Sequence, residues 1–481
     1  MRKNLLKKLI SGVLVASMVA LCTLATGVDT YAYNTVDMTT IGQSNSSAII
    51  VGTDVQYTAT FASRPSSDDG KLYLFELKTY EYGIPDGRSY ILSTEASTNV
   101  KVSFPLEYTG GYGRLYNKFV LAAKRGGTWV LVNNAQYITN PEAVATAPKA
   151  RAPREVKMLQ RGNVANISLT GSGVPTGIGA QHAVFTNTDP NVITADPHRA
   201  GDSHPVRNNP VVAYMLNADS DAGCEGLIAD MIAYADGLTN LQDFVIGNEV
   251  NERCWNYMAY VDWDTYVRKY VQAFRICYTA IKSHNPNAMV YTSLDQVWNK
   301  NTPNTEYLDG DEFLEKFNDM ILENGNIDWN LSIHPYPNPL YYPKFWDLSG
   351  VANGEMFKMQ VDTDQVITFQ NLSVVTNVLC QPKYLNRFGT VRDVIIGEIG
   401  MGTNAGDTAQ AVGLCAAWAA FERNPFITQF MYLEVDVNGF FPTLTPKSRE
   451  IFNALGTKDE AKYMTWAMKE IGITDWGQVL R

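Results

Sequence analysis

The feature that most constrains the fold is a change of hydrophobic pattern at about Arg154. Beyond this residue, short apolar runs alternate with longer amphipathic stretches over most of the remaining chain. A short continuous apolar run is typical of a parallel strand buried on both faces, and an amphipathic stretch is typical of a helix covering such a sheet. The region from Arg154 to Arg481 is therefore predicted to alternate β and α elements around a parallel sheet.

Eight apolar runs are predicted as strands, and the longer stretches between them include five predicted helices. The strands are expected at Val164–Leu169, His182–Thr186, Val211–Leu216, Phe244–Ile246, Ala288–Ser293, Trp329–His334, Val394–Ile396 and Phe430–Leu433, and the helices at Ala222–Tyr234, Tyr266–Ser283, Glu312–Glu323, Asn371–Asn386 and Thr408–Arg423. Eight strands in this length favour an α/β fold closed into a (β/α)8, or TIM, barrel. The alternative is a doubly wound open sheet, but no glycine-rich phosphate loop follows an early strand.

The N-terminal part has a different, two-residue period. It is clear in Lys71–Leu77 and Asn99–Phe104, and a Gly126-Gly127 pair joins two strand-like runs as a hairpin would. We therefore expect a β-sandwich-like accessory domain over residues 33–138. A Pro-, Ala- and Lys-rich segment over 139–153 is predicted to link it to the barrel at 154–481.

The first 32 residues have the order of a secretory signal peptide. Basic residues come first, an apolar stretch from Leu9 to about Leu24 follows, and small residues lead to Ala32, after which cleavage is expected. The alternative is a membrane anchor, but the apolar stretch is short for a span. The mature chain is therefore predicted to be secreted and extracellular, free or attached to the cell surface, and without a membrane contact of its own.

Charge and cysteine content exclude several classes of partner. Removing residues 1–32 takes away four basic residues and one acidic residue, so the formal net charge changes from −10 to −13. This balance disfavours nucleic acid as a partner. The five remaining cysteines contain no C-x-x-C pair, and the five histidines show no zinc-ligand spacing, so neither a metal nor another cofactor is expected.

Two apolar strands each end in a glutamate. Phe244–Ile246 leads to Glu249, and Val394–Ile396 leads to Glu398. In a parallel barrel the carboxyl ends of the strands open into one cleft, so both carboxylates would be delivered to the same place. Such a pair suits glycoside hydrolysis, in which one carboxyl group protonates the leaving oxygen and the other acts at the sugar carbon.

The run Gly247-Asn248-Glu249 resembles that of clan A glycoside hydrolases, whose Asn-Glu pair ends strand four. Glu398 stands where that clan has its nucleophile at the end of strand seven, and His334-Pro335-Tyr336 stands at strand six. The mature chain is also similar to a family of secreted bacterial barrel proteins known only as a domain of unknown function. That resemblance rests on the stretches 247–251, 291–295, 328–330, 334–337, 367–369 and 396–398.

The resemblance implies a retaining mechanism with Glu249 as acid/base, of raised pKa, and Glu398 as nucleophile. Asn248 would bind the sugar 2-hydroxyl, Tyr336 would donate a hydrogen bond to Glu398, and His334 would line the same wall. The chain departs from clan A at strand eight, where Tyr432-Leu433-Glu434 stands in place of the usual tryptophan.

Four further residues follow predicted strand ends and are candidates for binding substrate. Asp295 could bind a sugar hydroxyl or cap a helix, and Glu434 is a third carboxylate on the same rim, or a solvated loop acid. Trp298 and Trp346 could stack on the apolar face of a sugar, although aromatic residues in such loops also simply pack them down.

These features predict a secreted bacterial glycoside hydrolase that cleaves a β-linked oligo- or polysaccharide. A non-catalytic carbohydrate-binding or scaffolding protein on the same barrel is the alternative, and retention of both Glu249 and Glu398 counts against it. A metal-dependent barrel hydrolase is a third class, which the absence of an H-E-x-x-H motif disfavours.

Overall fold

The computed structural model describes the chain in ten segments. They are residues 45–146, 158–165, 182–187, 193–196, 216–237, 241–252, 262–301, 306–347, 364–433 and 443–480. The predicted signal peptide, the second half of the predicted linker and all but Leu216 of the predicted strand at 211–216 lie outside these residues. Within the described part, no helix is long and apolar enough to cross a membrane.

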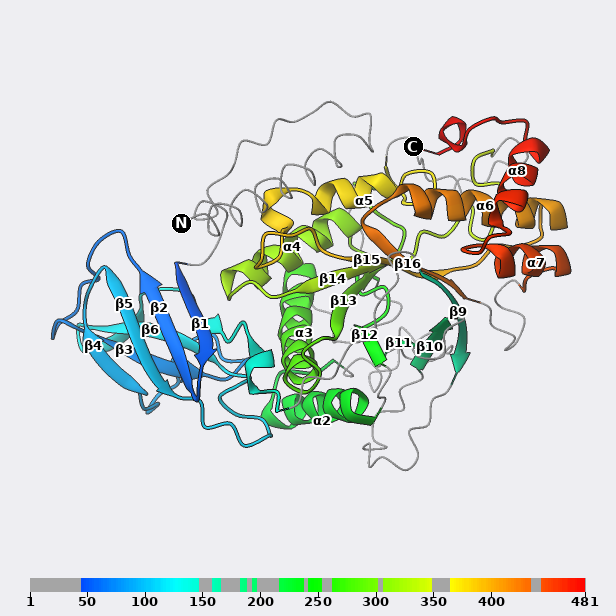
Figure 1. The fold of residues 1–481 in the computed structure, drawn as a ribbon. Coiled ribbons are helices and arrows are strands. Elements are labelled where there is room, and N and C mark those ends of the chain that lie inside the picture. The colour runs from blue at the N-terminus through cyan, green and yellow to red at the C-terminus, as the bar shows by residue number, and fades with distance from the viewer. Residues whose placement is uncertain are drawn as a thin grey trace, which may run out of the picture.

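Two antiparallel sheets form the N-terminal part (Figure 1). The first sheet contains β1 (Ser46–Val51), β2 (Asp54–Thr60) and β5 (Asn99–Pro105), and the second contains β4 (Leu92–Glu95), β3 (Lys71–Leu77), β6 (Lys118–Arg125) and β7 (Thr128–Leu131), with β8 (Gln136–Tyr137) paired to β6. Alternate side chains of both sheets enter one buried cluster, which includes Tyr57, Leu74 and Phe119. This arrangement explains the two-residue period of the sequence, because alternate side chains of a strand face the core.

The hairpin expected at Lys124–Gly127 is confirmed. Arg125 pairs with Thr128, so the loop consists of Gly126 and Gly127 alone. Both glycines have positive φ angles, 58° and 79°, as a two-residue type I′ turn requires.

A closed ring of eight strands forms the second part, which is mixed α/β. The strands are β9 (Met158–Ala165), β10 (His182–Asn187), β11 (Ile193–Asp196), β12 (Leu241–Val245), β13 (Met289–Leu294), β14 (Trp329–Ile333), β15 (Val394–Ile399) and β16 (Ile427–Leu433). From β11 through β16 to β9 the neighbours run parallel, but β10 is antiparallel to both β9 and β11. The ring is thus not the regular all-parallel (β/α)8 barrel of the prediction.

Two strands account for this difference. The predicted strand at His182–Thr186 exists, but β11 follows β10 after a connection too short for a crossover helix. The sequence analysis also missed β11 itself, because its four residues, Ile-Thr-Ala-Asp, form no apolar run. Including β11, the strands that precede Glu249 and carry Glu398 are the fourth and seventh of the ring.

Helices lie outside the ring and around its ends. They are α2 (Asp221–Gly237), α3 (Trp263–His284), α4 (Gly310–Glu323), α5 (Leu372–Leu379), α6 (Asp407–Arg423), α7 (Pro446–Ala454) and α8 (Glu460–Glu470). The helix predicted over Asn371–Asn386 stops at Leu379, because Pro382 cannot continue it and begins a separate 3-10 turn.

Helix α3 lies between the barrel and the N-terminal sheets (Figure 1). Its apolar face packs on the strands, while Gln272 and Arg275 on its other face are also buried. Gln272 Nε2 donates to the carbonyl oxygen of Thr79, and the Arg275 guanidinium lies 4.8 Å from the centre of the Tyr137 ring. Burial of this helix on nearly every side therefore depends on the N-terminal sheets.

Candidate active site

A tight turn after β12 carries Glu249. Ile246 continues the buried strand, Gly247 then takes a φ of 80°, and Glu249 itself takes a φ of 45°. A left-handed backbone is unfavourable for glutamate, and residues held in this region cluster at functional sites. The turn brings the Glu249 side chain toward the fifth and sixth strands, where 13% of its surface stays exposed.

Glu398 lies within β15, and its residue is only 4% exposed. The hydroxyl of Tyr336 donates to Glu398 Oε1 over 2.8 Å. Burial, and then the charge of Glu398, raise the pKa of Tyr336 well above its usual range, so this phenol stays a hydrogen-bond donor. This hydrogen bond fixes the orientation of the Glu398 carboxylate.

His334 lies between the two glutamates. Its Nδ1 atom is 2.8 Å from Glu249 Oε1 and 4.0 Å from Glu398 Oε2. These two carboxylate oxygens are therefore at most about 7 Å apart, the sum of the two distances. His334 is only 3% exposed, so the three side chains meet at a place from which water is largely excluded.

Ser293 connects His334 back to the backbone of Glu249. The Glu249 N–H donates to Ser293 Oγ, and Ser293 Oγ lies within hydrogen-bond reach of His334 Nε2, each over 3.3 Å. One consistent arrangement has the serine hydroxyl donating to Nε2 and the Nδ1–H donating to Glu249, which closes a ring of hydrogen bonds. The sequence analysis missed this role of Ser293, for which the only signal was its place at the end of a predicted strand.

Gly397 makes room for this arrangement. A Cβ atom at this position would lie 2.0 Å from Ser332 Oγ and 3.2 Å from His334 Nε2. Only glycine therefore lets β15 approach β14 closely enough for His334 to reach both carboxylates.

Asp295 is buried behind Glu249, not in an open cleft. Its Oδ1 accepts hydrogen bonds from Asn251 Nδ2 at 2.7 Å and from the Val297 N–H at 2.9 Å. Burial raises the pKa of Asp295 well above its usual range, and the neighbouring Glu252 and Glu249 carboxylates add to this effect. In the structure, Asp295 supports the loop that follows Glu249.

The other predicted binding residues lie in different environments. Asn248 is buried, and its Nδ2 has no hydrogen-bond partner in the part of the chain that the structure describes. Trp298 is only 2% exposed and packs in the hydrophobic core, whereas Trp346 is partly buried with its ring 5.2 Å from that of Phe345. Glu434 lies outside the described residues.

Metal ligation has no candidate cluster in the described segments. No group of three or more His, Cys, Asp or Glu side chains there is arranged to hold an ion. The arrangement of Glu249, His334, Tyr336 and Glu398 can instead deliver a proton from one carboxyl group while a second carboxylate stays charged.

Residues 192–479 match a family described as a family of unknown function, DUF5722. None of the curated proteins matches the sequence.

Among solved structures, the chain is similar at low identity to two β-glucuronidases and to a galactanase. An FMN-binding β-glucuronidase from Facaelibacterium prausnitzii L2-6 is 10% identical, with a TM-score of 0.27, over 83% of this chain and 56% of that one. A calcium-binding mutant of Bacteroides uniformis β-glucuronidase 2 is 8% identical (TM-score 0.32; 89% and 51%). A fungal β-1,4-galactanase is 15% identical (TM-score 0.28; 50% and 63%). The chain thus spans less than two thirds of each, and scores this low establish no shared fold.

Proposed function

We propose that this chain, which belongs to the DUF5722 family of unknown function, is a glycoside hydrolase that cleaves a β-linked oligo- or polysaccharide. The observation that carries the proposal is the position of His334 Nδ1, 2.8 Å from Glu249 and 4.0 Å from Glu398. Two carboxyl groups in one buried place, each with its own hydrogen-bond donor, suit an acid and a nucleophile better than a binding surface.

In this proposal Glu398 attacks the anomeric carbon and Glu249 protonates the departing oxygen. The Tyr336 hydroxyl donates to Glu398 and orients it, which supports its role as the attacking carboxylate. Glu249 then takes a proton from the water that releases the sugar, since the same group must act as acid and then as base. A separation of at most about 7 Å between Glu249 Oε1 and Glu398 Oε2 is compatible with retention, for which the carboxyl groups lie about 5 Å apart.

His334 would hold Glu249 in place between these two steps. In its neutral form it can donate to the Glu249 carboxylate or accept from the Glu249 carboxylic acid, while Ser293 adapts at the other nitrogen. Secretion through the predicted N-terminal signal is part of the proposal, because a polysaccharide substrate is met outside the cell.

The test is hydrolysis of a panel of plant, algal and bacterial polysaccharides by the wild type, Glu249→Gln and Glu398→Gln. We expect one glycan to be cleaved and each substitution to lower kcat by at least about 100-fold. Glu470→Gln, at an exposed position of α8, is the matched control and should retain full activity.

Retention is tested separately with Glu398→Ala and added azide. Azide should restore turnover and give a glycosyl azide of configuration opposite to that of the substrate, because it occupies the space of the missing carboxylate. A wild type that cleaves no glycan, yet binds one as tightly as the two glutamine variants do, would support the non-catalytic binding protein instead.

A further inference from the structure

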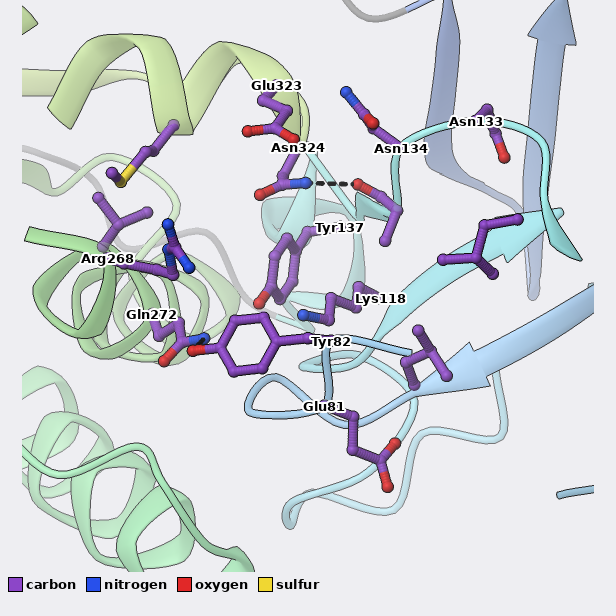
Figure 2. Close-up of a pocket in the computed structure, with 15 residues that line it drawn as sticks. Glu81, Tyr82, Lys118, Asn133, Asn134, Tyr137, Arg268, Gln272, Glu323 and Asn324 are labelled. Atoms are coloured by element: carbon purple, nitrogen blue, oxygen red, sulfur yellow. Dashed lines mark hydrogen bonds between the residues drawn. The ribbon is translucent and has the colours of Figure 1, made fainter. Parts of the chain in front are cut away.

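A cavity away from the candidate active site lies between the N-terminal sheets and helices α3 and α4 (Figure 2). Its volume is about 360 Å³, within the range of small-molecule sites. None of the residues of the candidate active site lines it. Its walls come from β6, from the loops after β3 and β7, and from the facing sides of the two helices, and they are rich in amide and charged side chains.

Lys118 brings a buried positive charge to this cavity. The residue is only 7% exposed, its Nζ donates to the Thr79 carbonyl oxygen over 3.1 Å, and it lies 5.2 Å from the centre of the Tyr82 ring. Among the described residues, no carboxylate comes within ion-pair distance of this ammonium group. A buried cation without a counter-ion is costly, and burial lowers the pKa of Lys118 to about 8.

Arg268 adds a second cation at the exposed side of the cavity. Its guanidinium carbon lies 5.9 Å from the centre of the same Tyr82 ring. Of the two acids in the lining, Glu81 is paired with Arg88 at 2.5 Å, and Glu323 is exposed. In a protein of net charge −10, these two cations make the cavity a candidate site for an anion.

The end of α4 and the loop before β8 form another wall, which carries hydrogen-bonding amide groups beside the exposed Glu323. Asn134 and Asn324 contribute amide groups, and Asn324 Nδ2 donates to the Ala135 carbonyl oxygen, which holds α4 to the loop before β8 (Figure 2). Amides both donate to and accept from hydroxyl groups. A bare anion such as phosphate would use the cations but leave this wall and most of the volume unfilled.

We infer that this cavity binds a sugar acid, with the carboxylate on Lys118 and Arg268 and the hydroxyl groups on the amide wall. A hexuronic acid has both groups in one small ring. The site is separate from the pair Glu249 and Glu398, so the inference does not depend on hydrolysis.

The test is calorimetric titration of the full chain with glucuronate and galacturonate, with methyl glucoside as the neutral comparison. We expect at least one of the two acids to bind and to bind at least tenfold more tightly than the glucoside. Lys118→Met should weaken its binding at least tenfold, and Arg268→Gln, at an exposed position, should weaken it several-fold. Lys124→Met, an exposed lysine of the same strand β6, is the matched control and should bind as the wild type does.

The pH dependence gives a second readout. A bound carboxylate favours the charged form of Lys118, so affinity should fall as pH rises from 7 to 9, through the pKa of about 8. The fall should be absent in Lys118→Met. The other titratable or charged groups around this ammonium are Glu81, Glu323, Arg275, Arg268 and the phenols of Tyr82 and Tyr137, so measurement on Lys118→Met is what assigns the effect.

Four outcomes would overturn the inference. The first is that neither acid binds at millimolar concentration, and the second is that phosphate binds as tightly as the acid. The third is that Lys118→Met and Arg268→Gln, both folded, bind the acid as the wild type does. Loss of binding in Glu249→Gln or Glu398→Gln, with Lys118→Met unaffected, would place the sugar in the active site and also overturn it. Absence of hydrolysis, by contrast, would count only against the proposed glycosidase.

Discussion

Single atoms decide the geometry around His334. Its two ring nitrogens contact Glu249 and Ser293. Strand β15 can lie this close to His334 only because Gly397 has no side chain. Close packing of this kind leaves no room for a methyl group, since protein interiors are as dense as organic crystals. The site is therefore sensitive to changes that add volume without altering charge.

Gly397→Ala should destabilise the protein by about 1–3 kcal/mol and lower activity, because the new methyl group displaces Ser332 and the His334 ring. Urea unfolding measures the first effect. The matched control is Gly226→Ala in α2, where a Cβ meets nothing within 4 Å and where alanine should stabilise the helix by about 0.5–1 kcal/mol. Equal stability of Gly397→Ala and the wild type would contradict the packing at this position.

As pH rises above about 4, the free energy of unfolding of Asp295→Asn should increase relative to that of the wild type. The folded state holds the Asp295 proton more tightly than the unfolded chain does, so wild-type stability is full below the unfolded pKa of about 3.9 and is lost as pH rises toward the folded pKa. The slope is at most about 1.4 kcal/mol per pH unit.

Denaturant unfolding of Asp295→Asn between pH 4 and pH 7 measures this difference. An asparagine Oδ1 can still accept from Asn251 and Val297, so the hydrogen bonds survive the substitution. Asp86→Asn, at an exposed position, controls for the loss of one negative charge. Parallel stability curves for Asp295→Asn and the wild type would rule out the raised pKa.

At the scale of elements, α3 holds the turn that carries Glu249. The hydroxyl of Tyr270 in this helix donates to the carbonyl oxygen of Ile246 at 2.7 Å and lies 3.0 Å from Thr292 Oγ1. One residue thus joins a helix to two neighbouring strands directly beneath the acid/base candidate. The strain in the backbone of Glu249 is held by contacts of this kind.

Tyr270→Phe should cost about 1–3 kcal/mol of stability, because it leaves the buried carbonyl oxygen of Ile246 without this donor. A double-mutant cycle with Thr292→Val should give a coupling energy of at least about 0.5 kcal/mol, since the two side chains share a hydrogen bond. Additive effects of the two substitutions on urea unfolding would contradict that contact.

At the scale of the whole molecule, the N-terminal sheets and the barrel share one hydrophobic cluster. Arg387 joins them with hydrogen bonds to the Thr139 carbonyl oxygen and to Glu142, while its Nε donates to Asp328 at 3.0 Å. Gln272 and Arg275 of α3 are buried only because the sheets cover them. The N-terminal part is therefore expected to brace the barrel.

Calorimetry of the full chain should accordingly give one unfolding transition, and a chain that begins at Arg154 should be poorly soluble or markedly less stable. Removing the sheets exposes the far face of α3, with its buried polar groups, to water. Arg387→Ala should lower the transition temperature of the full chain, with Arg64→Ala, at an exposed position, as the control. A truncated barrel as stable as the full chain would refute bracing.

Local sequence patterns predicted much of this structure. Apolar runs predicted seven of the eight ring strands at least in part, while the eighth predicted strand, at 211–216, lies outside the described residues except for Leu216. The Gly126-Gly127 pair predicted its hairpin, and the glutamates after two strands indicated a common site. These features are encoded within a few residues, because period, turn chemistry and strand ends depend on neighbours along the chain. The antiparallel direction of β10 was not encoded in that way.

Only the tertiary structure decided which residues far apart in the sequence are in contact. His334 meets Glu249 across 85 positions, Ser293 meets both, and Trp298 is buried in the core although it follows a strand as a sugar-stacking residue would. The cavity at Lys118 exists only where the sheets meet α3 and α4. Sequence alone thus determined which side chains stand at strand ends. Strand register and the packing of whole layers determined which of these side chains touch, because the distance between two of them depends on every element that lies between.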